Sequence, residues 1–89
     1  MKIFKKIIKK LKINRKYDFN QLLVIRDGIE NGLTQKQINL YLNPIYTWQQ
    51  MDEIKQGLED GLTIEQVSIY SNPKFDTLQM EKMRLKLRE

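Results

Sequence analysis

The chain has 89 residues, of which 40% are hydrophobic and 30% charged, and its net charge is +5 at pH 7. A chain this short folds as one small domain with a modest core, and it is too apolar to be disordered. Cysteine and histidine are both absent, which excludes disulfide bonds, thiolate or imidazole metal sites and the commonest general base. We therefore expect a single domain over residues 1–89 that is not an enzyme and holds no cofactor or metal.

The sequence also bears on location. No apolar run approaches the roughly 18 residues that a membrane-spanning helix needs. The apolar residues near the N-terminus alternate with lysines, so the continuous hydrophobic region of a secretory signal peptide is missing. We expect the protein to be cytoplasmic.

Residues 1–17 form a basic arm that contains eight cations and no acid, a charge of +8, whereas the rest of the chain has eight cations and eleven acids, a charge of −3. Within the arm, residues 2–12 are predicted to form an amphipathic helix. Its apolar residues fall within an arc of about 140°, with lysines on the opposite side. These apolar residues are Ile3, Phe4, Ile7, Ile8 and Leu11.

From residue 18 onwards the chain repeats itself every 29 residues. The run from Gly28 to Thr34 (GIENGLT) returns as Gly57 to Thr63 (GLEDGLT), and a third copy begins at Asp76. A fixed period of this length is typical of stacked repeats. We predict an all-α helical-repeat bundle of about six short helices, with two helices in each unit. Repeat 1 covers 18–46, repeat 2 covers 47–75 and a terminal half-repeat covers 76–89.

Helix boundaries follow from local signals. A capping box, in which an oxygen-bearing residue is followed three positions later by Gln, predicts each helix start. The five boxes begin at Asp18, Thr34, Thr47, Thr63 and Asp76. Glycine at 32 and 61 suits the left-handed residue that ends a long helix, and the Asn-Pro pairs at 43–44 and 72–73 end the short helices near Leu42 and Ser71.

Two further glycines, Gly28 and Gly57, fall inside the predicted long helices, where glycine costs about 1 kcal/mol relative to alanine. We expect them to allow close approach of a neighbouring helix backbone.

Subtracting one more period from the repeat aligns Phe4 with Leu33 and Leu62, so residues 1–17 are predicted to be a degenerate half-repeat that caps the stack.

The pattern Gln50-Met51-x-x-Ile54-x-x-Gly57-Leu58-x-x-Gly61-Leu62, followed by Tyr70-x-Asn72-Pro73-x-Phe75, resembles a helical repeat found in proteins of low-GC Gram-positive bacteria. Those proteins are often encoded on conjugative elements and phages. The resemblance covers residues 17–89 and implies a helical interaction module from a mobile genetic element. It carries no catalytic residue over to this chain.

The basic arm is the strongest functional signal. Its lysines could line the phosphates of DNA or RNA, attract an anionic membrane surface or an acidic protein, or stay solvated on a capping helix. The candidate contact residues are Lys5, Lys6, Lys9, Lys10, Lys12, Arg15 and Lys16.

Two other sets allow a structural and a functional reading. The aromatics Tyr17, Tyr46 and Phe75, with Tyr41 and Tyr70, could stack on bases, but their regular spacing favours the core. Trp48 aligns with Phe19 and Thr77, so we expect it between units with a partly exposed edge, where it could anchor a partner. The acids fit a solvated outer face better than a metal site. They are Asp27, Glu30, Asp52, Glu53, Glu59, Asp60 and Glu65.

We therefore expect a non-enzymatic macromolecular binding protein from a mobile element. Its most concrete form is an inhibitor of a host defence nuclease, of the anti-CRISPR or antirestriction kind. The alternatives are a DNA- or RNA-binding accessory protein that uses the basic helix, and a membrane-surface or self-associating module.

Overall fold

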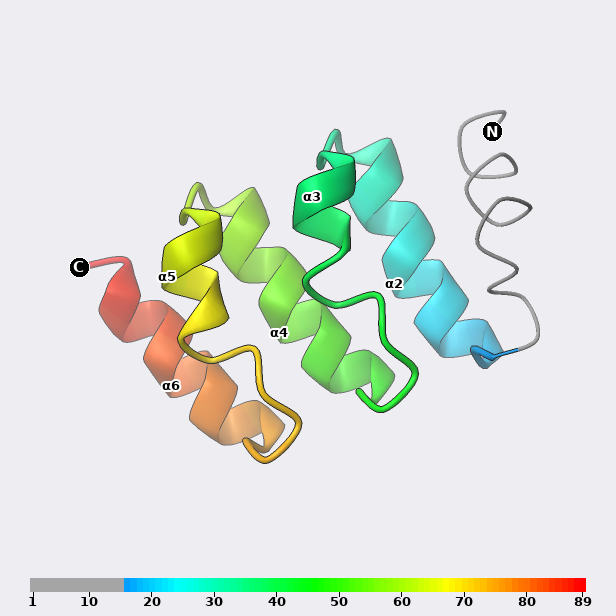
Figure 1. The fold of residues 1–89 in the computed structure, drawn as a ribbon. Helices are drawn as coiled ribbons and strands as arrows, with labels where there is room; N and C mark the ends of the chain where they lie inside the picture. The colour runs from blue at the N-terminus through cyan, green and yellow to red at the C-terminus, as the bar shows by residue number, and fades with distance from the viewer. Residues whose placement is uncertain (1–15) are drawn as a thin grey trace.

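The computed structural model describes residues 16–89, which form five α-helices and no strand (Figure 1). The long helices are α2 (Phe19–Glu30), α4 (Trp48–Glu59) and α6 (Thr77–Leu87), and the short ones are α3 (Gln35–Ile38) and α5 (Ile64–Ser68). The predicted all-α class is confirmed for this part of the chain. The helix predicted over 2–12 lies outside the described residues, as does all of the predicted cap except Lys16 and Tyr17.

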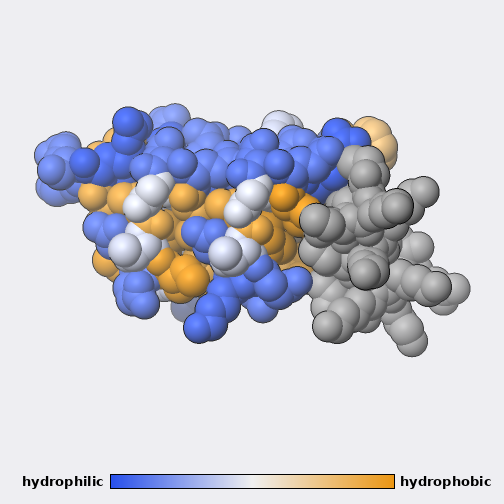
Figure 2. All heavy atoms as spheres, turned by 90° about the horizontal axis from the view of Figure 1, so that it is seen from above, coloured by the Kyte–Doolittle hydropathy of each residue, from blue (hydrophilic) through white to orange (hydrophobic). Residues whose placement is uncertain are grey.

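The long helices lie side by side in one layer, and the short helices lie on one face of it (Figure 1). Helix α4 packs between α2 and α6, while α3 contacts α2 and α5 contacts α4. From above, hydrophobic residues gather along the middle of the molecule beside a continuous hydrophilic band (Figure 2). No helix between residues 16 and 89 combines the length and the hydrophobicity that a bilayer span requires.

Each of the five helices begins with the predicted capping box. In α2, the backbone N–H of Gln21 donates to Asp18 Oδ1, and the backbone N–H of Asp18 donates to Gln21 Oε1, both at 2.8 Å. Each cap satisfies helix N–H groups that would otherwise lack a partner, and such caps stabilise a helix by about 1 kcal/mol. The predicted helix starts are therefore confirmed.

The capping glutamines of α2 and α4 have a second role. Gln21 Nε2 donates to the carbonyl oxygen of Tyr46 at 2.6 Å, and Gln50 Nε2 donates to that of Phe75 at 2.8 Å. Both amides are almost fully buried, at 6% and 7% exposure. One side chain thus caps a long helix and holds the Asn-Pro corner that follows the next short helix.

The short helices end earlier than predicted. Helix α3 stops at Ile38 and α5 at Ser68, rather than near Leu42 and Ser71. The backbone continues in a tighter turn, in which the N–H of Tyr41 donates to Ile38 O and the N–H of Tyr70 donates to Val67 O. These bonds close over three residues instead of four. The tighter turn directs both tyrosines into the core, where each is 0% exposed.

The glycines confirm one prediction and correct another. Gly32 and Gly61 adopt φ of 94° and 95°, the left-handed conformation predicted after a long helix. At Gly28 and Gly57, however, the close neighbour is not a helix backbone. A methyl group added there would overlap the hydroxyl oxygen of Tyr41 or Tyr70, respectively. The missing side chain makes room for a buried tyrosine from the same two-helix segment.

The aromatic residues lie in the core, as their spacing indicated. Tyr17, Tyr41, Tyr46 and Tyr70 are buried, and Phe75 packs against them as a partly buried residue. Burial raises the pKa of Tyr41 and of Tyr70 well above the ordinary value, so both hydroxyls stay protonated at neutral pH. These rings are therefore closed to stacking with bases.

The fit between Gly28 and Tyr41 can be tested with Gly28→Ala. We expect it to lower the free energy of unfolding by about 1–3 kcal/mol, because the new methyl group overlaps the tyrosine hydroxyl. In a Tyr41→Phe background the loss should be much smaller, since the nearest remaining atom is the flexible Ile38 Cδ1, at 3.0 Å. Gly32→Ala is the control, because its strain comes from φ and should not depend on Tyr41. Equal losses for Gly28→Ala in both backgrounds, measured by urea unfolding, would contradict this explanation.

The two tyrosine hydroxyls differ in their hydrogen bonds. Tyr70 Oη donates to the carbonyl oxygen of Glu53 at 2.7 Å, whereas Tyr41 Oη is buried without a partner among the described residues. We expect Tyr70→Phe to lower the free energy of unfolding by about 1 kcal/mol and Tyr41→Phe to leave it unchanged or raise it. Thermal unfolding of both variants measures the difference, and an equal loss in both would be the contrary result.

Candidate interaction surface

Exposed hydrophobic side chains gather where α2 and α4 begin. Phe19 and Trp48 are the first residues of these helices and are 72% and 40% exposed. Ile45, 63% exposed, lies in the corner before α4. Gln21 binds the carbonyl oxygens on either side of Ile45 and so holds this corner against the first turn of α2. The three side chains therefore belong to one edge of the molecule.

Two cations occupy the same repeat position as Ile45, one period before it and one after it. Lys16 precedes α2 and Lys74 lies in the corner before α6, and both are exposed. The three long helices begin at this edge (Figure 1), and each helix start carries a partial positive charge. We call the surface made by Lys16, Phe19, Ile45, Trp48 and Lys74 the helix-start edge. It is apolar in the middle, and each side carries a lysine together with an exposed N-cap aspartate, Asp18 or Asp76.

A shallow hollow of about 340 Å³ lies between the starts of α4 and α6. Its lining consists of hydroxyl, amide and carboxylate side chains, from Thr47, Gln49, Gln50, Asp76 and Thr77. A partner that covered the starts of α4 and α6 would meet these polar side chains. Apolar anchors surrounded by polar groups are the usual anatomy of protein–protein contacts.

The structure gives a mixed result for the predicted site residues. The placement of Trp48 between units is wrong, because it is 40% exposed and is not part of the core; its role as a partner anchor stays a prediction, and Lys16 lies on the same edge. The other predicted contact residues lie outside the described residues; they are Lys5, Lys6, Lys9, Lys10, Lys12 and Arg15. Phe19, the repeat equivalent of Trp48, is also exposed. Ile45 and Lys74 were missed, although the contrast of Ile45 with lysine at equivalent positions was visible in the sequence.

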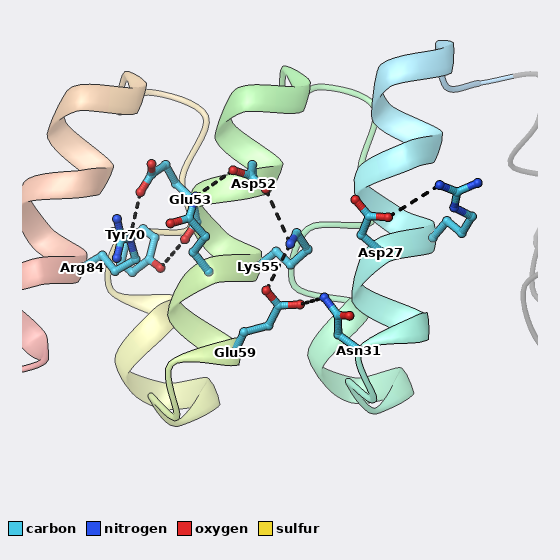
Figure 3. Close-up of polar contacts among 10 residues, drawn as sticks. Asp27, Asn31, Asp52, Glu53, Lys55, Glu59, Tyr70 and Arg84 are labelled. Atoms are coloured by element: carbon cyan, nitrogen blue, oxygen red, sulfur yellow. Dashed lines mark hydrogen bonds and ion pairs between the residues drawn. The ribbon is translucent and has the colours of Figure 1, made fainter.

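For Glu53, the prediction of a solvated acid is wrong. Its side chain is only 13% exposed, and Glu53 Oε1 accepts a hydrogen bond from Arg84 Nε at 2.9 Å (Figure 3). Arg84 Nη1 also lies 3.3 Å from Asp60 Oδ2. Burial lowers the pKa of Arg84, but the hydrogen bond and charge of Glu53, with the charge of Asp60, outweigh it and raise the pKa. This arginine therefore joins α6 to α4 as a permanent cation.

Other acids are also engaged at helix contacts. Asn31 Nδ2 donates to Glu59 Oε2 at 2.7 Å, which joins α2 to α4 (Figure 3). Lys55 Nζ lies 3.1 Å from Glu59 Oε1 and 3.6 Å from Asp52 Oδ1, within α4. Over the described range, no group of three or more acids could hold a metal ion. The acidic residues at these contacts thus contribute to helix packing.

Comparisons with protein-family models, curated proteins and solved structures gave no match to this chain. The class that the structure itself defines is an all-α protein with exposed apolar side chains at the starts of its long helices.

The link between α4 and α6 predicts unequal effects for two arginines. Arg84→Met should lower the free energy of unfolding by about 2 kcal/mol, because it leaves the mostly buried Glu53 carboxylate without its partner. Arg88→Met should lower it by less than about 0.5 kcal/mol, since Arg88 is 51% exposed and lies 3.7 Å from Asp60. Adding Glu53→Leu to Arg84→Met should restore part of the loss. Urea unfolding measures all three, and equal effects of the two arginine variants would count against a buried ion pair.

Proposed function

We propose that this chain is a non-enzymatic binding protein that presents the helix-start edge to a macromolecular partner. The observation that carries the proposal is the exposure of Trp48 next to Ile45 and Phe19, at 40%, 63% and 72%. Tryptophan is among the residues that most often dominate binding energy at interfaces, and an aromatic side chain buries a large area when a partner covers it. A protein partner fits this edge best.

The proposed architecture is a stack of two-helix units of 29 residues, capped by the N-terminal half-repeat as a sixth helix. Matching contacts one period apart support it. Gln21 binds the Tyr46 carbonyl as Gln50 binds that of Phe75. The pair Gly28 and Tyr41 likewise corresponds to Gly57 and Tyr70. In such a stack the core positions repeat, and the positions that vary are free to specify a partner.

The most concrete form of the proposal is an inhibitor of a host nuclease that targets nucleic acid, encoded by a mobile element. The resemblance to repeats of mobile elements, the small size and the charge segregation support it. The chain would cover the path of the nucleic acid on the nuclease, with the basic arm in contact. Lys16 supports a continuous contact, because it belongs both to that arm and to the helix-start edge.

A second candidate is direct binding of DNA or RNA through the basic arm. The exposure of Lys16 and Lys74 on the same edge favours it. Binding of this kind would weaken steeply as the salt concentration rises, because each phosphate contact releases a counterion.

The proposal is tested with cleavage assays on guide-RNA nuclease complexes and restriction enzymes, with the full chain added. We expect the chain to slow cleavage by its target nuclease, and Trp48→Ala to raise the concentration needed by at least about tenfold, since loss of a hot-spot aromatic removes about 2 kcal/mol or more. Ile69→Ala is the matched control, because Ile69 is 57% exposed at the end of α5, away from the helix starts.

Three outcomes would redirect the proposal. Undiminished cleavage by every such nuclease would remove the inhibitor hypothesis. Equal effects of Trp48→Ala and Ile69→Ala would remove the helix-start edge as the contact. Tight binding to a DNA or RNA duplex without any nuclease, lost at high salt, would favour the second candidate.

A further inference from the structure

The outer face of α6 differs from the corresponding face of α4. Helix α4 meets α6 through Glu53, which binds Arg84, and it meets the segment that follows α5 through Gly57, which makes room for the hydroxyl of Tyr70. One period later these positions are Lys82 and Lys86, and both are exposed. Helix α6 therefore lacks the two features through which α4 contacts the two segments that follow it.

These two lysines oppose the addition of another unit of the same kind. A side chain at the Gly57 position would overlap the tyrosine that packs there. Lys86 would therefore exclude the corresponding tyrosine of an added unit. Lys82 would face the cation that occupies the Arg84 position. If the added unit belonged to a second copy stacked head to tail, the residue at this position would be Arg26, which lies two 29-residue periods before Arg84 in the sequence. Two α6 helices paired symmetrically would bring their own lysines together, and like charges placed opposite each other repel.

The same face nevertheless carries exposed leucines. Leu78 and Leu85 are 58% and 45% exposed. The equivalent residues are Gln49 and Gln56 in α4, and Asn20 and Asp27 in α2, so these positions are apolar in the last copy alone. Residues seven apart lie on one line along a helix, and Lys82 and Lys86 fall within about 100° of that line.

We propose that this outer face of α6, defined by Leu78, Lys82, Leu85 and Lys86, binds an acidic amphipathic helix of another protein. The leucines would cover the apolar stripe of that helix, and the lysines would pair with its carboxylates. Within residues 16–89, neither lysine has a carboxylate within ion-pair distance. Glu81 borders the two leucines on the side opposite Lys86, and Glu89 follows the last turn of α6.

Charge and shape together select this occupant. A helix laid along another helix is read through side chains three, four and seven residues apart, which is the spacing of the four residues on this face. Nucleic acid fits less well, because leucine offers neither a stacking plane nor a phosphate contact. The proposal is independent of the helix-start edge, which depends on Trp48.

The test uses the full chain, labelled with ¹⁵N, and a synthetic acidic peptide of about four helical turns. The peptide has leucines seven residues apart flanked by glutamates, and a second peptide replaces each glutamate with lysine. We expect the acidic peptide to shift the amide signals of α6 and to bind at least about tenfold more weakly to L78S/L85S and to K82E/K86E. K82E/K86E should instead prefer the lysine peptide, whereas Trp48→Ala should bind the acidic peptide as the parent chain does.

Because the changed side chains are exposed, these variants should keep the fold, which the amide spectrum checks directly. The proposal is overturned if the acidic peptide leaves the α6 signals unmoved or if the parent chain binds the lysine peptide equally well. It is also overturned if a short DNA duplex shifts the same signals more strongly than the peptide. Self-association of the parent chain that K82E/K86E abolishes, seen by sedimentation, would assign the face to a second copy.

Discussion

The fold depends on a glutamine amide that makes hydrogen bonds in two directions. In α2 and α4, the Oε1 atom of Gln21 or Gln50 accepts from the N-cap backbone, and the Nε2 atom donates to the corner that follows the next short helix. A buried amide left without partners would be costly, so both ends must be satisfied together. Local helix capping is thereby coupled to the contact between segments 25 residues apart. The same bonds fix the corner that presents Ile45.

Much of the fold was predictable because its signals are local. Capping boxes and left-handed glycines act through residues three or four apart, and all of those predictions are confirmed. The reason for Gly28 was not predictable in the same way. It depends on the reach of Tyr41, which follows from the tighter turn after α3. Glu53 was misread for a similar reason, because its charge alone does not reveal that Arg84 lies against it.

The candidate site was less predictable than the fold. Trp48 stood out as the one tryptophan, but it was assigned to packing between units with only an edge exposed, and Ile45 was missed. A repeat pattern reports which positions are equivalent, and it does not report which side of the unit faces solvent. Positions such as 45 and 74 were informative only after the Gln21 and Gln50 hydrogen bonds located them beside the helix starts.

Comparison of copies separates packing from recognition. Where a position serves the core, as with Tyr41 and Tyr70, the residue recurs, because both copies must fill the same space. Where residues change polarity between copies, packing within the unit does not require either choice. Ile45 against Lys16 and Lys74, and Leu85 against Gln56, are changes of this second kind. Both lie on exposed surfaces: Ile45 at the starts of the long helices and Leu85 on the outer face of α6. Residues that bind a partner are therefore best sought at positions that differ between copies, because packing between the units does not fix the residue type there.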